Sequence, residues 1–255
     1  MTRNFGLCLA LMLLLCSCGA GPTTGTSHEA GSGPQTTGQP ASQSRGKRHR
    51  ERHRGAALPG ESAATGKFDF YVLSLSWSPG FCATPSGRDD TMQCGPERHF
   101  AFVMHGLWPQ YEKGGWPEDC STEQADQSVL DGMLAIMPSP KLVTHEWQKH
   151  GTCSGLSAKD YFDDATEAFN SIKIPTQYQA TNRQIVLGPD QLRDDFAAAN
   201  PKLGQQGFAV LCSGNGRYLQ EVRACLTEDL EGRACNAEVL RDECKSDRIV
   251  MRPSR

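Results

Sequence analysis

The sequence predicts a single α+β domain, stabilised by disulfides, over residues 66–255. Segments typical of strands and segments typical of helices follow one another without strict alternation, which favours the α+β class. Apolar residues make up 38% of the 255-residue chain, which is enough for a hydrophobic core. Eight cysteines lie in this region, and an even number behind an export signal indicates a disulfide framework.

Residues 1–18 have the features of an export signal. A positive charge precedes the apolar run Leu7–Leu15, which is too short to span a bilayer. The sequence Leu-Cys-Ser-Cys-Gly at Leu15–Gly19 resembles a bacterial lipoprotein processing site, with Cys18 as the lipidated N-terminus; ordinary cleavage near Ala20 is the alternative. We therefore expect an exported protein, either a periplasmic or cell-envelope lipoprotein held to the membrane only by its lipid, or a secreted protein.

Residues 19–65 are predicted to form a disordered linker. They are rich in Gly, Ser, Thr, Pro and Gln and contain no aromatic residue, so they cannot bury enough apolar surface to offset the entropy of ordering. Within the linker, residues 45–54 hold six Lys and Arg. This basic arm is either a solvated, unfolded stretch or a contact for anionic surfaces such as RNA phosphates or acidic lipids.

The predicted domain is acidic. Residues 61–255 carry 19 Lys and Arg against 27 Asp and Glu, a net charge of −8. A general nucleic-acid-binding domain is normally basic. Any chemistry on nucleic acid would therefore take place at a local site and not through the overall field of the domain.

The first half of the domain is predicted to contain two strands and a helix. Phe68–Trp77 is rich in residues that favour strands. His99–Met104 is predicted as a second strand that delivers His105 at its end. Residues 123–136 are predicted to form a helix, stopped by Pro138.

The second half is predicted to contain three helices and two strands. Residues 144–150 form one helix, and Ser157 is a plausible N-cap for another that extends to about Phe169. A third helix, Pro189–Ala199, has proline in its first turn. The two strands, on either side of a Ser-Gly-Asn-Gly turn, are Gly207–Cys212 and Arg217–Cys225.

Two dense patterns contain three of the four histidines of the domain. They are His105-Gly-Leu-Trp-Pro109 and His145-Glu-Trp-Gln-Lys-His-Gly-Thr-Cys153. On a helical wheel that starts at His145, Lys149, Glu146 and His150 fall at about 40°, 100° and 140°. The four ionisable groups therefore share one half of the helix, which would present a base, a cation and a carboxylate together. His99 lies outside both patterns, and we interpret it as structural.

The spacing argues against a metal site. Zinc metalloproteases place two histidines four residues apart, whereas His145 and His150 are five apart. The domain has no Cys-x-x-Cys pair and no Gly-x-Ser-x-Gly nucleophile motif, and we expect every domain cysteine to be paired. We expect no metal and no cofactor.

Two histidines without a metal or a covalent nucleophile suit a substrate that carries its own nucleophile. RNA supplies its 2′-hydroxyl: one imidazole removes that proton, and the other protonates the departing 5′-oxygen. A nearby lysine stabilises the charge on the phosphorane between them. DNA lacks the hydroxyl and would not react.

The two patterns resemble the active-site signatures of the ribonuclease T2 family. The resemblance extends from about Phe68 to Cys244 and implies an α+β fold around an antiparallel sheet flanked by helices. It also implies endonucleolytic transesterification to a 2′,3′-cyclic phosphate with little base specificity. Three further motifs carry it: Trp77-x-Pro-x-x-Cys82, Trp116-Pro-x-x-Cys120 and Leu219-x-Glu-Val-x-x-Cys225.

The resemblance implies a role for each residue of the two signatures. His150 is the general base, His105 is the general acid, and Trp108 stacks on a base of the substrate, as aromatic faces do in single-strand sites. Core packing is the alternative for Trp108 and the interpretation we prefer for Trp147. The residues that would hold the phosphate or stabilise the transition state are His145, Glu146 and Lys149.

The resemblance also implies a disulfide pairing, which spacing alone could not select. The chain departs from the family pattern at Ser76, Gln110 and Leu142, near the base pockets, so its base preference stays open. The four implied pairs are Cys82–Cys94, Cys120–Cys153, Cys212–Cys244 and Cys225–Cys235.

The sequence thus predicts an exported endoribonuclease that acts as a monomer on RNA. The main alternative is a catalytically idle RNA-binding or toxin-like protein of the same fold, which the intact histidines and lysine disfavour. A metal hydrolase is disfavoured by the histidine spacing.

Overall fold

The structure is a computed structural model that describes residues 65–254. The predicted signal (1–18) with Cys18, the linker up to residue 64 and the basic arm (45–54) lie outside the described residues. Within the described part of the chain, no helix is both long and apolar enough to cross a membrane.

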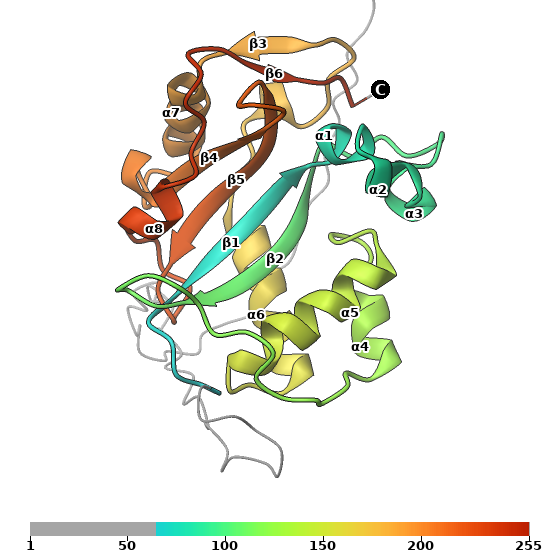
Figure 1. Cartoon of the computed structure of the whole chain (residues 1–255), viewed down its shortest axis with the longest axis vertical. Helices are drawn as coiled ribbons and strands as arrows, with labels where there is room; N and C mark the ends of the chain where they lie inside the picture. Colours follow the sequence, from blue (N-terminus) through green and yellow to red (C-terminus); the bar gives the residue numbers. More distant parts are fainter. Residues whose placement is uncertain (1–64, 255) are drawn as a thin grey trace, which may run out of the picture. The chain divides into compact units, whose positions relative to one another are not determined.

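A six-stranded sheet forms the centre of the domain (Figure 1). Its order is β2–β1–β5–β6–β3, and β4 also pairs with β5. All pairs are antiparallel except β5 with β6, so the expected antiparallel sheet is present with one parallel contact. The strands are β1 (Phe70–Trp77), β2 (Phe102–Gln110), β3 (Ile185–Leu187), β4 (Phe208–Ser213), β5 (Tyr218–Leu226) and β6 (Ile249–Met251).

Helices surround this sheet, as the α+β class requires. Figure 1 shows α4, α5 and α6 gathered beside β1 and β2, and α7 near β3 and β4. The helices are α1 (Ser78–Cys82), α2 (Pro85–Arg88), α3 (Thr91–Cys94), α4 (Gln127–Gly132), α5 (Pro140–Lys149), α6 (Ala158–Ser171), α7 (Pro189–Ala199) and α8 (Ala237–Leu240).

Helices α6 and α7 begin where the local signals predict. The hydroxyl of Ser157 accepts a hydrogen bond from the backbone N–H of Asp160, which satisfies a donor at the start of α6. Pro189 is the first residue of α7, where its missing N–H costs nothing. These two helices carry strong capping signals in the sequence itself.

Two predicted helices have different bounds in the structure. The helix predicted over 123–136 is reduced to α4, because beyond it the carbonyl of Ile136 accepts a hydrogen bond of 2.9 Å from the N–H of Met104 and joins the edge of the sheet. The helix predicted over 144–150 starts earlier, at Pro140, and ends one residue before His150.

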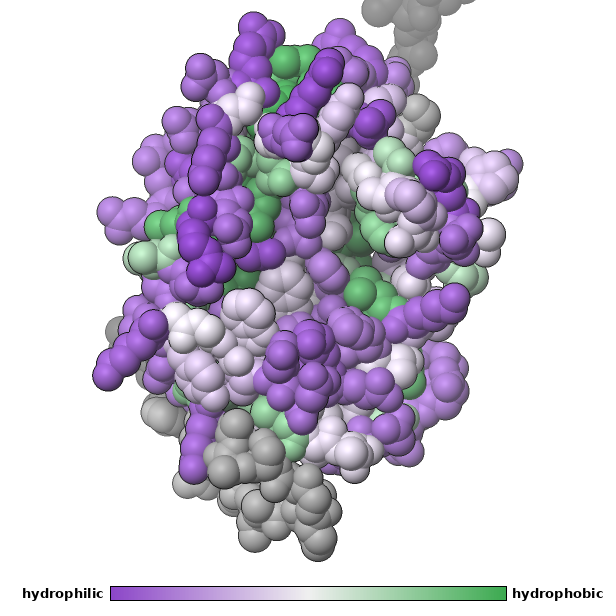
Figure 2. All heavy atoms as spheres, in the orientation of Figure 1, coloured by the Kyte–Doolittle hydropathy of each residue, from purple (hydrophilic) through white to green (hydrophobic). Residues whose placement is uncertain are grey.

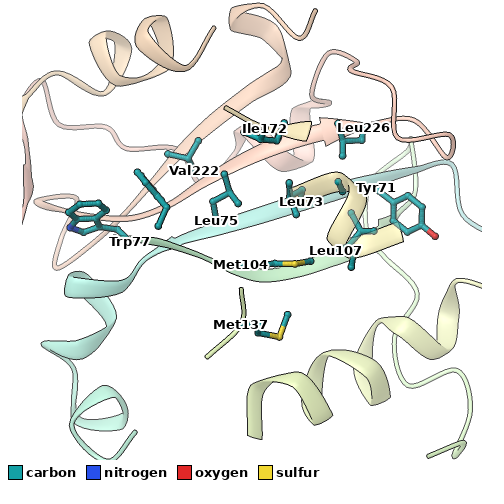
Figure 3. Close-up of a cluster of buried hydrophobic side chains, with 14 of the residues drawn as sticks. Tyr71, Leu73, Leu75, Trp77, Met104, Leu107, Met137, Ile172, Val222 and Leu226 are labelled. Atoms are coloured by element: carbon teal, nitrogen blue, oxygen red, sulfur yellow. The ribbon is translucent and has the colours of Figure 1, made fainter. Parts of the chain in front are cut away.

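The core occupies both faces of the sheet. Alternate residues of β1, among them Leu73 and Leu75, belong to a large cluster that also includes side chains of α5, α6 and α7 (Figure 3). The intervening residues Phe70 and Val72 belong to a smaller cluster on the opposite face. The face with the smaller cluster has room for a site, and we call it the site face.

Four disulfides tie the loops to this framework. They are the four pairs that the resemblance implies: Cys82–Cys94, Cys120–Cys153, Cys212–Cys244 and Cys225–Cys235.

Candidate active site

A β-bulge places His105 on the site face. Ser74 of β1 lies opposite Gly106 of β2, but the next residue, Leu75, lies opposite Met104, so His105 is an extra residue in β2. A bulge of this kind changes the direction of a side chain next to a regular ladder. The prediction that a strand over 99–104 ends before His105 is therefore wrong in its bounds: β2 continues to Gln110.

His105 is held by an acidic residue of β5 that lies outside the two histidine patterns. Its Nδ1 lies 2.7 Å from the carboxylate of Glu221 on β5, which is 2% exposed. The guanidinium of Arg223 donates two hydrogen bonds, of 3.0 and 3.1 Å, to the other oxygen of Glu221. Glu221 belongs to the Leu-x-Glu-Val motif of the resemblance, which was the only signal for it.

Burial and this carboxylate act in opposite directions on His105. Burial lowers the pKa of His105, but the hydrogen bond and charge of Glu221, with the charge of Glu146, outweigh it, so the pKa lies above its ordinary value. The same contact, together with the charge of Arg223, holds the pKa of Glu221 below its ordinary value despite burial. The geometry therefore favours a protonated His105 with its Nε2 side unblocked by Glu221.

Glu146 projects from α5 into the same cluster. It is 1% exposed, accepts a hydrogen bond of 2.7 Å from the Trp108 indole N–H, and has its other oxygen 3.7 Å from Nε2 of His105. Burial raises the pKa of Glu146 to about 7, against the opposing effects of the His105 charge and the Trp108 hydrogen bond. Gly106 makes this approach feasible, because a Cβ there would overlap both the carboxylate and the indole.

His150 lies on the other side of Trp108. The Trp108 indole centroid is 5.2 Å from the His105 ring and 5.5 Å from the His150 ring. His150 is 8% exposed, and its Nδ1 is buried with no hydrogen-bond partner among residues 65–254. Burial, followed by the charges of His145 and Lys149, lowers the pKa of His150 to about 3, so its imidazole is neutral at neutral pH.

The four ionisable side chains predicted to share one half of a helix do not all lie together in the structure. Glu146 and Trp147 are buried, and Trp147 donates its indole N–H to the backbone carbonyl of Glu123; its burial fits the packing role expected for it. His145 is exposed on the outer side of α5, and His150 is the first residue beyond the helix. The helical wheel therefore grouped these residues correctly only in part.

Lys149 is paired with two acidic residues of a neighbouring loop. Its Nζ lies 2.8 Å from Glu118 and 3.7 Å from Asp119, and the hydrogen bond to Glu118 raises the pKa of Lys149. The Cys120–Cys153 disulfide joins the ends of the two segments, and the carbonyl of Lys149 accepts a hydrogen bond from the N–H of Asp119. The loop thus sets the position of the lysine.

A cavity of about 280 Å³ opens beside these groups. Trp108, Lys149 and His150 line one part of it, and α8 with the following residue Arg241 lines another. The Arg223 guanidinium lies 5.0 Å from the Trp108 ring centroid, which orients the indole. A planar aromatic ring, a neutral imidazole and a cation therefore share one cavity. His99, in contrast, is exposed and does not line this cavity.

Among residues 65–254, no group of three or more His, Cys, Asp or Glu side chains is arranged to hold a metal ion.

Sequence comparisons identify similar proteins over most of the described region. The ribonuclease T2 family model matches residues 68–235. A ribonuclease from Aeromonas hydrophila is 36% identical over 196 residues, which are 71% of this chain and 82% of the relative. A probable ribonuclease from Haemophilus influenzae is 39% identical over 148 residues, 53% of this chain and 52% of the relative.

Solved structures with the same fold are also found. An RNase-related protein from Calystegia sepium aligns with a TM-score of 0.60 at 22% identity, over 74% of this chain and 99% of that chain. Trichomaglin, described as an S-like ribonuclease, aligns with a TM-score of 0.58 at 19% identity, over 74% of this chain and all of that chain. At these identities the likeness shows a shared fold.

Proposed function

The chain belongs to the ribonuclease T2 family, and from this membership we propose that it is an exported endoribonuclease that cleaves single-stranded RNA with His105 and His150. The observation that carries the proposal is the position of the two histidines on either side of Trp108: Nδ1 of His105 lies 2.7 Å from the carboxylate of Glu221, whereas Nδ1 of His150 has no hydrogen-bond partner among residues 65–254. The pKa of His105 is raised beside Glu221, whereas the pKa of His150 is lowered to about 3. An acid and a base are thus available in the same pH range.

The reaction is a transesterification within one nucleotide. His150 accepts the proton of the 2′-hydroxyl, and the 2′-oxygen forms a bond to phosphorus. The bond from phosphorus to the 5′-oxygen breaks, and His105 gives its proton to that oxygen. The products are a 2′,3′-cyclic phosphate and a free 5′-hydroxyl, and each proton transfer contributes about 10²–10⁴-fold to the rate.

His105 suits the acid step because its Nδ1 is already hydrogen-bonded to Glu221. Glu221 binds Nδ1 at 2.7 Å, which orients the ring and leaves Nε2 as the proton donor. Glu146, 3.7 Å from Nε2, stabilises the proton there until the phosphate arrives. Glu221 therefore acts as a positioning residue for the acid.

The phosphate would be held by charge from α5. His145 stands at its exposed edge, and Lys149 lies beside the cavity. In the free protein Lys149 is paired with Glu118, so binding of RNA would exchange a carboxylate for a phosphate oxygen. A lysine placed this way stabilises the charge of the phosphorane.

Trp108 is proposed to stack on a base at the cavity, and specificity is proposed to be low. The cavity walls are mainly indole and imidazole rings and long side chains, and aromatic faces accept every base. Gln110 is the main amide in the wall. Its hydrogen-bonding groups would give a bias among bases and not a strict choice.

Export is proposed from residues 1–18, followed by the linker (19–65) and a monomeric catalytic domain (66–255). The four disulfides support it, because such bonds persist in oxidising compartments. We propose lipidation at Cys18 as the form of membrane attachment. The intact mass of the mature protein tests this: a lipidated cysteine supports it, and an unmodified N-terminus near Ala20 contradicts it.

The experiment for the proposed activity uses purified protein with a chelator. Single-stranded RNA should be cleaved in excess EDTA, while DNA of the same sequence stays intact. His105→Ala and His150→Ala should each reduce the rate by about 10²-fold or more without loss of the folded state. Inhibition by EDTA that zinc reverses would contradict the mechanism, and no cleavage by the wild type would favour the catalytically idle alternative.

A further inference from the structure

The site face continues along β5 beyond the proposed catalytic residues. In the β4–β5 ladder, Leu211 lies opposite Glu221 and Ser213 lies opposite Tyr218. Leu211 and Ser213 are two residues apart, so Tyr218 and Glu221 share a face, and Gln220 is the extra residue of a bulge. Tyr218 therefore lies on the site face, about 10 Å along the strand from Glu221.

Two guanidinium groups contact the Tyr218 ring. Arg252 lies 4.2 Å from the ring centroid and Arg217 lies 5.5 Å from it. Arg252 also lines a cavity of about 420 Å³ together with Arg98 and His99. Figure 2 shows that hydrophilic residues cover much of the face of the domain that it presents, with smaller hydrophobic patches between them. We call Arg98, His99, Arg217, Tyr218 and Arg252 the basic strip.

Within the described part of the chain, the three arginines of the basic strip form no ion pair with a carboxylate. Between residues 65 and 254, no Asp or Glu lies within 4.0 Å of the guanidinium of Arg98, Arg217 or Arg252. In a domain with excess acid, unpaired cations gathered at one place are an unusual arrangement. The arginines that do form ion pairs are Arg193, Arg223, Arg233 and Arg241.

We propose that the basic strip binds backbone phosphates of single-stranded RNA outside the nucleotides at the two catalytic histidines. The inference rests on the proposed function. A guanidinium binds phosphate through two parallel N–H groups. The Tyr218 ring occupies a face of the Arg252 guanidinium and leaves its N–H edges available.

The strip and the cavity at Trp108 lie at opposite ends of the site face. Val72, which lines that cavity, pairs with Cys225, whereas Ser76 pairs with Glu221, nearer to Tyr218. An RNA strand with a base at the cavity and its scissile phosphate at the histidines would therefore extend toward the strip. Contacts to phosphates carry no base information, so the strip increases affinity for long RNA of any sequence.

The test compares a long and a short substrate with the full-length chain. Arg217→Gln/Arg252→Gln is assayed on a single-stranded RNA of about 20 nucleotides and on a dinucleoside monophosphate. We expect kcat/KM on the long RNA to fall about 5–10-fold at low salt. The slope of log kcat/KM against log salt should become less steep by ~1.4, about 0.7 for each lost phosphate contact. Activity on the dinucleotide should not change.

A matched control removes the same charge elsewhere. Arg183→Gln/Lys202→Gln alters two exposed cations outside the strip and should leave both activities near wild type. Equal losses for the control and the strip variant, or an equal loss on the dinucleotide, would overturn the proposal. Affinity for a non-cleavable oligodeoxyribonucleotide gives a readout without catalysis. If the wild type cleaves neither substrate, the proposed function is wrong. Independently of cleavage, an unchanged affinity of the strip variant for the oligodeoxyribonucleotide would refute phosphate binding by the basic strip.

Discussion

Replacing Glu221 with glutamine should move the pH dependence of the enzyme. An amide keeps the shape and a hydrogen-bonding oxygen 2.7 Å from His105 but removes the negative charge. The carboxylate raises the pKa of His105, so its loss lowers that pKa. A general acid must be protonated, and the rate falls as pH rises through its pKa. The alkaline limb of kcat/KM should therefore shift to lower pH.

The size of the shift follows from the contacts of Glu221. Two unit charges about 4 Å apart interact by about 4 kcal/mol at an effective dielectric constant of about 20. Arg223 shares the carboxylate through two hydrogen bonds and offsets part of this effect. We therefore expect a change of about 1.5–2.5 kcal/mol, which corresponds to a shift of about 1–2 pH units.

The assay is the pH profile of kcat/KM on a dinucleoside monophosphate. Arg223→Met is the control, because it should shift the profile in the opposite direction. Arg223 lowers the pKa of His105, so its removal should move the alkaline limb to higher pH. The other groups that face His105, namely Glu146 and His150, are unchanged in both variants. A Glu221→Gln profile that superimposes on the wild type, or a uniform loss at every pH, would refute the reasoning.

Three further predictions concern the surroundings of the site. Lys149→Ala should lower kcat more than it raises KM, because its charge is needed mainly in the transition state; a change in KM alone would contradict this. Cys120→Ser/Cys153→Ser should cost about 3–4 kcal/mol of stability and should lose activity at temperatures where circular dichroism shows a folded protein. The control is Cys225→Ser/Cys235→Ser, which removes the disulfide that closes the shortest loop and should cost much less activity. Deleting residues 45–54 should weaken binding to anionic vesicles or RNA at low salt and leave dinucleotide cleavage unchanged; an unchanged affinity would make the arm a spacer.

Residues that favour a helix start predicted from the sequence where two of the helices begin. Ser157 and Pro189 marked the starts of α6 and α7 because capping and proline geometry act within a few residues. The end of the strand at His105 was not predictable in this way. The strand was predicted to end at Met104, but β2 continues to Gln110. It accommodates Pro109 because it is an edge strand, where a missing N–H is tolerated.

The partners of the histidines depended on tertiary structure. The two signatures identified His105 and Glu146, and the structure brings both to Trp108. Glu221 lies 116 residues from His105, and only the β1–β5 register together with the bulge in β2 brings them into contact. No periodicity in the sequence encodes that register.

The most direct test of the two-histidine mechanism is to identify the new ends of the product. An oligodeoxyribonucleotide with one central ribonucleotide is incubated with the enzyme in EDTA, and early products are examined by mass spectrometry. Transesterification by His105 and His150 predicts one cut, on the 3′ side of the ribonucleotide, with a 2′,3′-cyclic phosphate and a 5′-hydroxyl. Ends with a 3′-hydroxyl and a 5′-phosphate, or cleavage at the deoxyribonucleotides, would contradict it.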